Sequence, residues 1–509
     1  MDKILIKLKK LFIDKNYDEV IKISKENINY GSRTPAIYNL LSVSLELTGK
    51  IEEAEKILKE AIRTNSNEIS FRINIGRIQR IRKKLKDSEE NLSYGFKIND
   101  KDQNLLFQYG ILKRIQKNFK IAVNIFKKLS VLNIEYPDAL LYLAESYLDL
   151  FYDQNNKNYY NKAKENFLKC SQLFPERVYV DLKLSDMIDY SKEDDHQKSM
   201  LNKLEKLNLN FRQKALIYKA VAKSFEDKKD YDRAHEFYKK FNDLRNKTIN
   251  KNIMSNEKEK FKKIKKIFLK VISSNMDIES KINKKIIFIL GLPRSGTTLV
   301  HQLIDNSDEI DGLGESPILD KNLSYLIKDN SININSFLEV GKNIIDEYNI
   351  SSTKKIIIDK LPINFYWIGF IKLMFPSSKV IHVNRNLKDV FLSLYKNSFG
   401  NYQMDWCYNE KNILSFINNY REVMNFWKTR YKDYIFDLKY ENLVSNQEEE
   451  TKRLFKFCDL KWNRKIFDFY KKGKRINTAS ISQVKKSIYK SSIDSNKKYI
   501  QKMSFLKEL

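Results

Sequence analysis

The chain has 509 residues, 42% of them hydrophobic, and a formal net charge of +29 at pH 7. The hydrophobic content is that of a globular protein, the length suits two or three domains, and no apolar run reaches the roughly twenty residues that cross a bilayer. The charge would suit a nucleic acid, but no nucleic-acid-binding motif is present and lysine is abundant throughout, so we expect neither a nucleic acid nor a membrane as a partner.

The N-terminal half is helical by pattern and repeats every thirty-four residues. One position of the repeat carries small or apolar residues, which are Val20, Ala54, Ser88 and Ala122, with Ala163 and Ala234 in later units. The position four residues further on carries Ser24, Leu58, Leu92, Phe126, Phe167 and Tyr238. An ordinary helical bundle does not predict such a register, so we expect a solenoid of helical hairpins.

This register resembles the tetratricopeptide repeat, whose arrays offer a concave surface to peptides or extended segments. The resemblance is strongest over residues 35–136 and 211–245, and a degenerate unit is expected around 178–210. It implies a tetratricopeptide-repeat helical array over residues 1–248 that recruits an acceptor or partner, with homodimerisation as an alternative use. The first twenty residues are interrupted by lysines and are expected to form the first repeat helix rather than a signal peptide.

Residues 249–283 are lysine-rich and lack glycine, which predicts a connecting helix and linker. Beyond them, residues 286–298 read IIFILGLPRSGTT, and the pattern predicts a buried strand, a glycine-bounded turn and the start of a helix. This order aims backbone N–H groups and a helix N-terminus at a phosphate, and it favours that interpretation over an ordinary turn. The predicted binding residues are Pro293, Arg294, Ser295, Gly296, Thr297 and Thr298.

The spacing from Gly291 to Gly296 is that of the nucleotide P-loop, but Thr297 stands where that loop carries a lysine. That lysine reaches the β- and γ-phosphates of a triphosphate. Without it the loop can still hold a phosphate, and Arg294 adds a planar fork of donors. The sequence therefore favours a nucleotide that carries a 5′-phosphate and a further leaving group.

Two later strands are predicted to end beside this loop. One apolar run leads into Asp359 and Lys360, and another leads to Arg385, with Ser393 two helical turns further on. Ligands of such sheets bind outside the carboxyl ends of the strands, where an arginine and a serine can hold one phosphate from two sides. Asp359 after an apolar run also resembles a Walker B strand, which keeps a P-loop nucleotide kinase as an alternative.

These segments resemble, in order, the motifs of sulfotransferases that use 3′-phosphoadenosine 5′-phosphosulfate (PAPS), especially the tyrosylprotein sulfotransferase-like branch. The matching segments are PRSGTTL (293–299), GLGESPILDKN (312–322), IIIDKLP (356–362), RNLKDVFLSLY (385–395) and TASISQV (478–484). The resemblance implies a sulfotransferase fold over residues 284–509. The predicted fold class is thus an all-α solenoid followed by an α/β P-loop-like domain with a central parallel sheet.

The resemblance also implies a role for each matching residue. The loop would bind the 5′-phosphosulfate, and Arg385 with Ser393 would bind the 3′-phosphate. Ser480 would contact the nucleotide.

Three further residues are expected to act on the reacting groups. Lys360 and Arg294 would neutralise charge on the sulfuryl group, and Glu315 would take the proton of the acceptor. The protein-tyrosine enzymes generally carry two consecutive glutamates at this place, where this chain has Glu315 and Ser316.

The sequence therefore predicts a PAPS-dependent sulfotransferase that requires no metal and sulfates a hydroxyl, best matched by a tyrosine of a protein or peptide. The alternatives are a carbohydrate or small-molecule hydroxyl as acceptor, a kinase-like P-loop enzyme, and a non-catalytic scaffold. Three widely separated cysteines favour a reducing compartment, so we expect a cytoplasmic protein whose partner is an acceptor peptide, protein or glycan.

Overall fold

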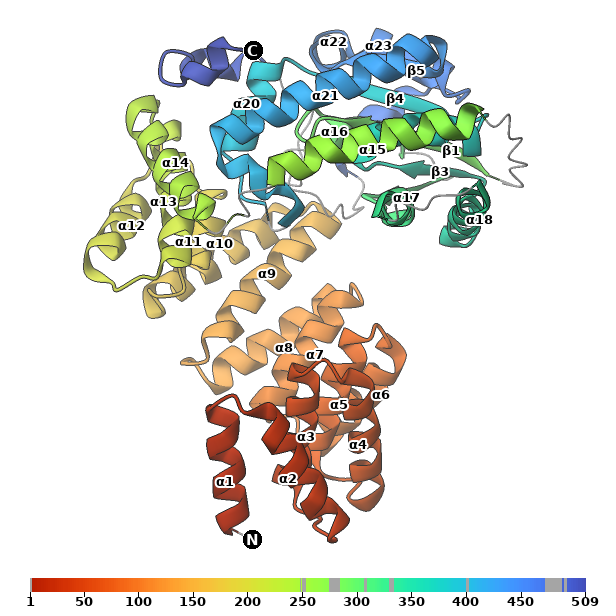
Figure 1. Ribbon diagram of the computed structural model, residues 1–509. Helices are drawn as coiled ribbons and strands as arrows, with labels where there is room; N and C mark the ends of the chain where they lie inside the picture. Colours follow the sequence, from red (N-terminus) through yellow and green to blue (C-terminus); the bar gives the residue numbers. More distant parts are fainter. Residues whose placement is uncertain are drawn as a thin grey trace. The chain divides into compact units, whose positions relative to one another are not determined.

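The structure of this chain is a computed structural model that describes residues 2–247, 249, 253–273, 284–305, 309–328, 334–399, 402–471, 488 and 492–509. The chain divides into two compact units, Met1–Met187 and Ile188–Leu509. Figure 1 labels the elements of both. Each unit contains hydrophobic clusters of its own.

The first unit is a run of helices joined in pairs by short turns (Figure 1). Its helices are α1 (Asp2–Ile13), α2 (Tyr17–Asn29), α3 (Pro35–Leu47), α4 (Ile51–Thr64), α5 (Ile69–Ile81), α6 (Leu85–Ile98), α7 (Gln103–Ile115), α8 (Phe119–Leu132), α9 (Pro137–Gln154), α10 (Lys157–Leu173) and α11 (Tyr179–Ser185). The predicted helical repeat is confirmed for this unit.

The predicted repeat register is confirmed by burial. Val20, Ala54, Ser88, Ala122, Ala163 and Ala234 are all fully buried. The apolar members of the second position are buried as well. The α5–α6 pair shows why the first position must be small: the Ser88 hydroxyl donates a hydrogen bond of 2.7 Å to the carbonyl of Gly76, and a Cβ on Gly76 would lie 2.5 Å from Leu92. The two helices therefore cross too closely for larger side chains at these places.

The turns within the first four helix pairs share one geometry that the sequence analysis missed. Lys15, Gly49, Lys83 and Lys117 lie thirty-four residues apart and all have positive φ, from 59° to 81°. In the α5–α6 turn, Lys83 N–H donates to the carbonyl of Arg80 and Lys84 N–H to that of Gln79, the two bonds of a Schellman motif. Glycine is the usual residue there, but this chain uses lysine in three of the four turns.

We expect Lys83→Gly to stabilise the α5–α6 hairpin by about 1 kcal/mol, because glycine adopts positive φ without the clash that a Cβ makes. Slower amide exchange in α5 and α6 would measure the gain. Gly49→Ala is the reciprocal variant and should destabilise α3–α4 by a similar amount. Unchanged exchange in both hairpins would show that the left-handed residue carries no strain.

The second unit contains a five-stranded sheet of order β2–β3–β1–β4–β5 in which every pairing is parallel, so the predicted parallel sheet is confirmed. The strands are β1 (Lys285–Gly291), β2 (Ile310–Gly314), β3 (Ile356–Asp359), β4 (Lys379–Asn384) and β5 (Ile435–Lys439). Its α-helices are α12 (Asp195–Lys206), α13 (Phe211–Asp227), α14 (Tyr231–Asn246), α15 (Ile253–Ser273), α16 (Thr297–Ile304), α17 (Ile318–Lys328), α18 (Ile334–Ser351), α19 (Ile368–Met374), α20 (Leu387–Tyr395), α21 (Glu410–Tyr431), α22 (Tyr440–Ser445) and α23 (Gln447–Phe457). Short 3₁₀ helices are η1 (Pro362–Trp367), η2 (Tyr402–Tyr408), η3 (Lys432–Tyr434), η4 (Arg464–Lys471), η5 (Ser495–Lys498) and η6 (Ser504–Lys507).

Helix α15, predicted as a connecting helix, packs on the α/β layer. It runs alongside α21 in Figure 1, and the Phe268 ring meets Trp427 edge-on with centroids 4.8 Å apart. Phe261 makes a similar contact with Phe426 at 5.9 Å. The apolar face of this lysine-rich helix therefore belongs to the core of the second unit. The end of the repeat array near residue 248 stays a prediction.

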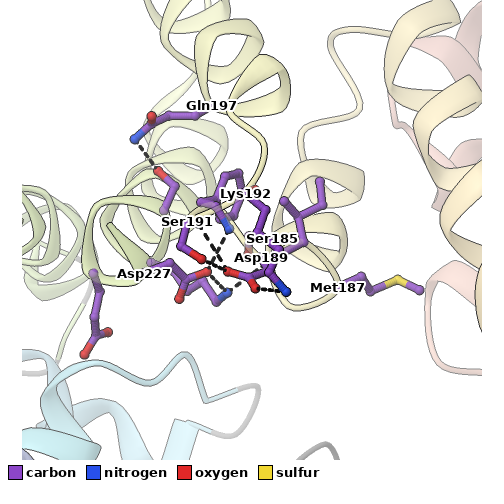
Figure 2. A network of polar contacts seen from close by, with 12 residues as sticks. Ser185, Met187, Asp189, Ser191, Lys192, Gln197 and Asp227 are labelled. Carbon is purple, nitrogen blue, oxygen red and sulfur yellow. Dashed lines mark hydrogen bonds and ion pairs between the residues drawn. The ribbon is translucent and has the colours of Figure 1, made fainter. Parts of the chain in front are cut away.

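The start of the second unit is irregular, in line with the degenerate repeat expected around 178–210. Asp189 accepts hydrogen bonds from the backbone and hydroxyl of Ser191 at 3.2 and 2.6 Å and pairs with Lys192 (Figure 2). These bonds, that of the Ser191 hydroxyl first, lower the pKa of Asp189. Asp227 at the end of α13 accepts from the backbone N–H of Tyr190 at 3.3 Å. Hydrogen bonds to the carboxylates of Asp189 and Asp227 thus stabilise this segment, where a regular repeat helix would supply hydrogen bonds between backbone groups.

The last predicted repeat, α13–α14, contacts the sheet-containing part of the same unit. Asn242 donates a hydrogen bond of 3.0 Å to the carbonyl of Tyr395 at the end of α20. The Tyr231 ring meets that of Tyr499, near the C-terminus, with centroids 5.5 Å apart. Among the described residues, no helix has the length and apolar character to cross a membrane.

Candidate functional site

The predicted site residues come together because four neighbouring parallel strands end at one edge of the sheet. The loop 292–296 follows β1, Glu315 follows β2, Lys360 follows β3 and Arg385 follows β4. The strand register pairs Phe288 with Asp359 and aligns the end of β1 with that of β4. This edge is where parallel sheets bind ligands.

The loop after β1 is shaped by two glycines that cannot be replaced without conflict. Gly291 has φ +150°, and a Cβ there would lie 2.5 Å from the backbone oxygen of Val383. Gly296 has φ +106°, and its Cβ would lie 2.4 Å from the ring of Tyr440. The loop therefore turns sharply into α16, whose first residues are the buried Thr297 and Thr298. The first N–H groups of a helix have no partner within the helix, so they are available to an anion.

The two arginines and Ser393 form one connected group. Arg294, which has φ +72°, donates from Nε to the Ser393 hydroxyl at 3.0 Å. Arg385 donates from Nη1 to the carbonyl of Arg294, also at 3.0 Å. Residues separated by 91 and 99 positions are thus joined beside the loop. Pro293, also predicted for the site, is buried in the same turn.

Two residues beside Arg385 were not singled out from the sequence. The Tyr440 ring lies under the guanidinium, with its centroid 4.7 Å from Cζ, and the carbonyl of Ser492 accepts from Nη2 at 2.7 Å. The Tyr440 hydroxyl and the Ser492 hydroxyl are 2.8 Å apart. No motif or periodicity in the sequence singles out Tyr440 or Ser492 as part of the site. Ser480, predicted to contact the nucleotide, lies outside the described residues.

Lys360 and Glu315 form an ion pair at the end of β3. Lys360 Nζ lies 2.6 Å from Glu315 Oε1; the lysine side chain is 0% exposed and the glutamate side chain 40% exposed. Burial lowers the pKa of Lys360, and the charge of Glu315 opposes part of that shift. Ser316, the other residue at this place, is buried, and its hydroxyl accepts from the backbone N–H of Ile318 at the start of α17. Of these two residues, Glu315 contacts Lys360 and is partly exposed, whereas the Ser316 side chain is buried against the start of α17.

Asp359 has a structural environment rather than that of a magnesium ligand. Its carboxylate is fully buried and accepts hydrogen bonds from the Tyr348 hydroxyl at 2.5 Å and from Asn364 at 3.0 Å. Burial raises its pKa to about 7, although the hydrogen bond from Tyr348 works in the opposite direction. Both oxygens are engaged, which weighs against the Walker B interpretation. The described residues contain no cluster of three or more histidine, cysteine or carboxylate groups suited to a metal.

Two buried polar atoms at the site have no hydrogen-bond partner among the described residues. They are the hydroxyl oxygen of Ser295 in the loop and Nε of Arg385. Unpaired buried donors are costly, and both groups can donate to an anion. Together with the helix N-terminus and the Lys360 ammonium, they fit a ligand that carries negative charge at more than one point.

Comparison with known proteins matches residues 287–464 to a family model described as the sulfotransferase family. An uncharacterised protein of Aquifex aeolicus is 32% identical over 295 residues, which cover 54% of this chain and 39% of that protein. A protein of Caenorhabditis briggsae named "Putative protein-tyrosine sulfotransferase" is 24% identical over 222 residues, which cover 40% of this chain and 78% of that protein. The chain thus spans well under half the length of the Aquifex protein.

Solved structures of tetratricopeptide repeat proteins are similar to part of this chain. A tetratricopeptide repeat protein from Parabacteroides merdae has a TM-score of 0.35 and 16% identity, covering 50% of this chain and 94% of its own. The C-terminal part of a tetratricopeptide repeat protein from Cytophaga hutchinsonii has a TM-score of 0.36 and 16% identity, covering 47% of this chain and 95% of its own.

Proposed function

We propose, from the match of residues 287–464 to the sulfotransferase family model, that this chain transfers a sulfuryl group from PAPS to an acceptor hydroxyl. The observation that carries the proposal is the buried Lys360 ammonium paired with the half-exposed Glu315 carboxylate beside a lysine-free P-loop. This combination provides a cation for the sulfuryl group and a base for the acceptor within 2.6 Å of each other.

Donor binding uses the two ends of the site. The loop residues Ser295, Gly296, Thr297 and Thr298 and the start of α16 hold the 5′-phosphosulfate. Arg385 and Ser393 hold the 3′-phosphate, with Arg294 linking the two groups through its bond to Ser393. The unpaired Ser295 hydroxyl and Arg385 Nε support this assignment, because each gains an acceptor when an anion binds.

The reaction is a displacement at sulfur. The acceptor oxygen forms a bond to sulfur while the bond from sulfur to the bridging phosphate oxygen breaks, and 3′-phosphoadenosine 5′-phosphate leaves with that electron pair. Glu315 accepts the hydroxyl proton. Lys360, with Arg294, offsets the charge that builds on the sulfuryl and bridging oxygens, as fixed cations do in phosphoryl transfer.

The acceptor we propose is a tyrosine of a protein or peptide, brought to the site by the tetratricopeptide-like array. The name of the Caenorhabditis relative supports a tyrosine acceptor, and a repeat array suits an extended polypeptide. A carbohydrate or small-molecule hydroxyl is the rival acceptor. An assay with labelled PAPS and tyrosine peptides, glycans or simple phenols distinguishes the tyrosine acceptor from its rivals. Transfer to glycans alone would overturn the tyrosine assignment.

The first test is a calorimetric titration with 3′-phosphoadenosine 5′-phosphate. We expect binding, and we expect Arg385→Ala to weaken it about 100-fold, because a charge-assisted fork to a phosphate is lost. Arg385→Lys should recover only part of the affinity, since lysine keeps the charge but not the two parallel donors. Arg453→Ala is the control, because that arginine lies on α23 and contacts Glu450 and the Phe436 ring rather than the loop residues.

The same titration with ATP and Mg²⁺ addresses the kinase alternative. Preference for ATP with Mg²⁺ over the bisphosphate would reject the sulfotransferase proposal in favour of a kinase-like enzyme. Binding of neither nucleotide would favour a scaffold without catalytic activity.

A further inference from the structure

Asp389 is a buried carboxylate that fastens the C-terminal segment to helix α20. The side chain is 0% exposed and lies in the first turn of the helix. It accepts four hydrogen bonds, all at 2.9 Å, from residues more than a hundred positions away. The donors are the backbone N–H groups of Asp494 and Asn496, the hydroxyl of Ser495 and the side-chain amide of Asn496.

These bonds are not needed to start the helix. Asn386 caps α20 by accepting from the N–H groups of Lys388 and Asp389. A buried charge is tolerated only where hydrogen bonds replace its water, and here the four donors all come from residues 494–496. The carboxylate therefore serves to hold that segment, and the positive end of the helix dipole helps to hold the charge.

The segment held in this way reaches the donor site two residues earlier. Ser492 offers its carbonyl to Arg385 Nη2 and its hydroxyl to Tyr440. The Tyr440 ring lies against both the Arg385 guanidinium and Gly296. Arg385 is thus held by the loop carbonyl of Arg294 on one side and by the C-terminal segment on the other.

We propose that Asp389 is a positioning residue for Arg385: by fixing residues 494–496 it places the Ser492 carbonyl that aims the guanidinium at the donor. The proposal rests on the proposed function, in which Arg385 holds the 3′-phosphate. A fixed guanidinium loses less freedom when the phosphate binds, so the tether contributes to donor affinity and not to the chemical step.

The test compares three variants in the full chain. Asp389→Asn removes the charge and can no longer accept from all four donors, Ser495→Ala removes one bond from the opposite side, and Asn386→Ala removes the cap of the same helix without touching the segment. We expect Asp389→Asn to raise the KM for PAPS at least tenfold, to leave kcat within twofold, and to speed amide exchange over residues 492–499. Ser495→Ala should raise the KM two- to fourfold and add nothing to Asp389→Asn in the double variant, because both act through one contact.

Asn386→Ala should lower the melting temperature but keep the KM within twofold. Equal effects of Asn386→Ala and Asp389→Asn on the KM would overturn the proposal, since Asp389 would then only stabilise α20. Faster exchange of residues 492–499 with an unchanged KM would also overturn it, because the segment would not position Arg385. Failure of the unmodified chain to bind 3′-phosphoadenosine 5′-phosphate would instead reject the proposed function, and this proposal with it.

Discussion

Lys360→Met should lower kcat about a thousandfold, equivalent to about 4 kcal/mol of transition-state stabilisation. Methionine matches the length of the lysine stem but carries no charge, so the sulfuryl and bridging oxygens lose their buried cation. The affinity for 3′-phosphoadenosine 5′-phosphate should change by less than threefold, because that product lacks the sulfuryl group. Single-turnover rates with PAPS and product titration measure the two quantities separately.

The fold should tolerate this substitution. Lys360 is fully buried, and methionine fills its place with an apolar side chain; removing one partner of an ion pair is strongly destabilising when the other charge stays buried. Its partner Glu315 is half exposed and can be hydrated once the pair is lost. Lys379→Met is the control, since Lys379 also pairs with a carboxylate, that of Asp459, but is the first residue of β4 and therefore lies at the opposite edge of the sheet. A kcat for Lys360→Met within tenfold of the unmodified chain would remove Lys360 from the proposed chemistry.

Gly291→Ala should destabilise the second unit by about 4 kcal/mol and abolish donor binding. The residue has φ +150°, and its Cβ would lie 2.5 Å from the backbone oxygen of Val383 on the neighbouring strand β4. Positive φ alone costs about 1–2 kcal/mol, and relief of the clash requires the central strands to separate. Chemical denaturation followed by tryptophan fluorescence measures the loss, because all four tryptophans lie between residues 367 and 462.

Gly341→Ala is the matched glycine control. Gly341 lies in the middle of α18, and the nearest atom to its added Cβ would be Met374 Sδ at 3.8 Å, an ordinary contact. Alanine there should be neutral or stabilise the unit by up to about 1 kcal/mol, because helical glycine is entropically unfavourable. Equal effects of the two alanine substitutions would show that the loop after β1 has no special backbone requirement.

The local sequence pattern was sufficient to predict the helices and strands that show a repeat register or an apolar run. The thirty-four-residue register selected side chains that are fully buried, because the helix crossing in each hairpin places small or apolar residues at one fixed position. The apolar runs before the loop, before Lys360 and before Arg385 form strands β1, β3 and β4, and Ser393 lies in helix α20 as expected. Parallel strands then bring their carboxyl ends to one edge, which is why Lys360 and Arg385 could be placed beside the loop.

Contacts over long sequence separations were not predictable in the same way. The Arg294–Ser393 bond, the Tyr440 ring under Arg385 and the four bonds to Asp389 join segments that lie about 50 to 110 residues apart. No periodicity encodes such pairs, since they depend on how strand order brings loops together. The left-handed lysines at the hairpin turns were missed because glycine is the residue expected there.

The sequence by itself determined the architecture, a helical repeat followed by a parallel α/β layer, and the chemical character of a phosphate-binding loop without its lysine. It did so because repeat spacing, apolar runs and glycine positions act locally. The tertiary structure alone decided that Glu315 and not Ser316 faces the buried Lys360, and that the C-terminal segment holds Arg385. Those outcomes depend on which charged and polar groups the folded chain brings together, because a buried charge is stable only where the fold places a partner beside it.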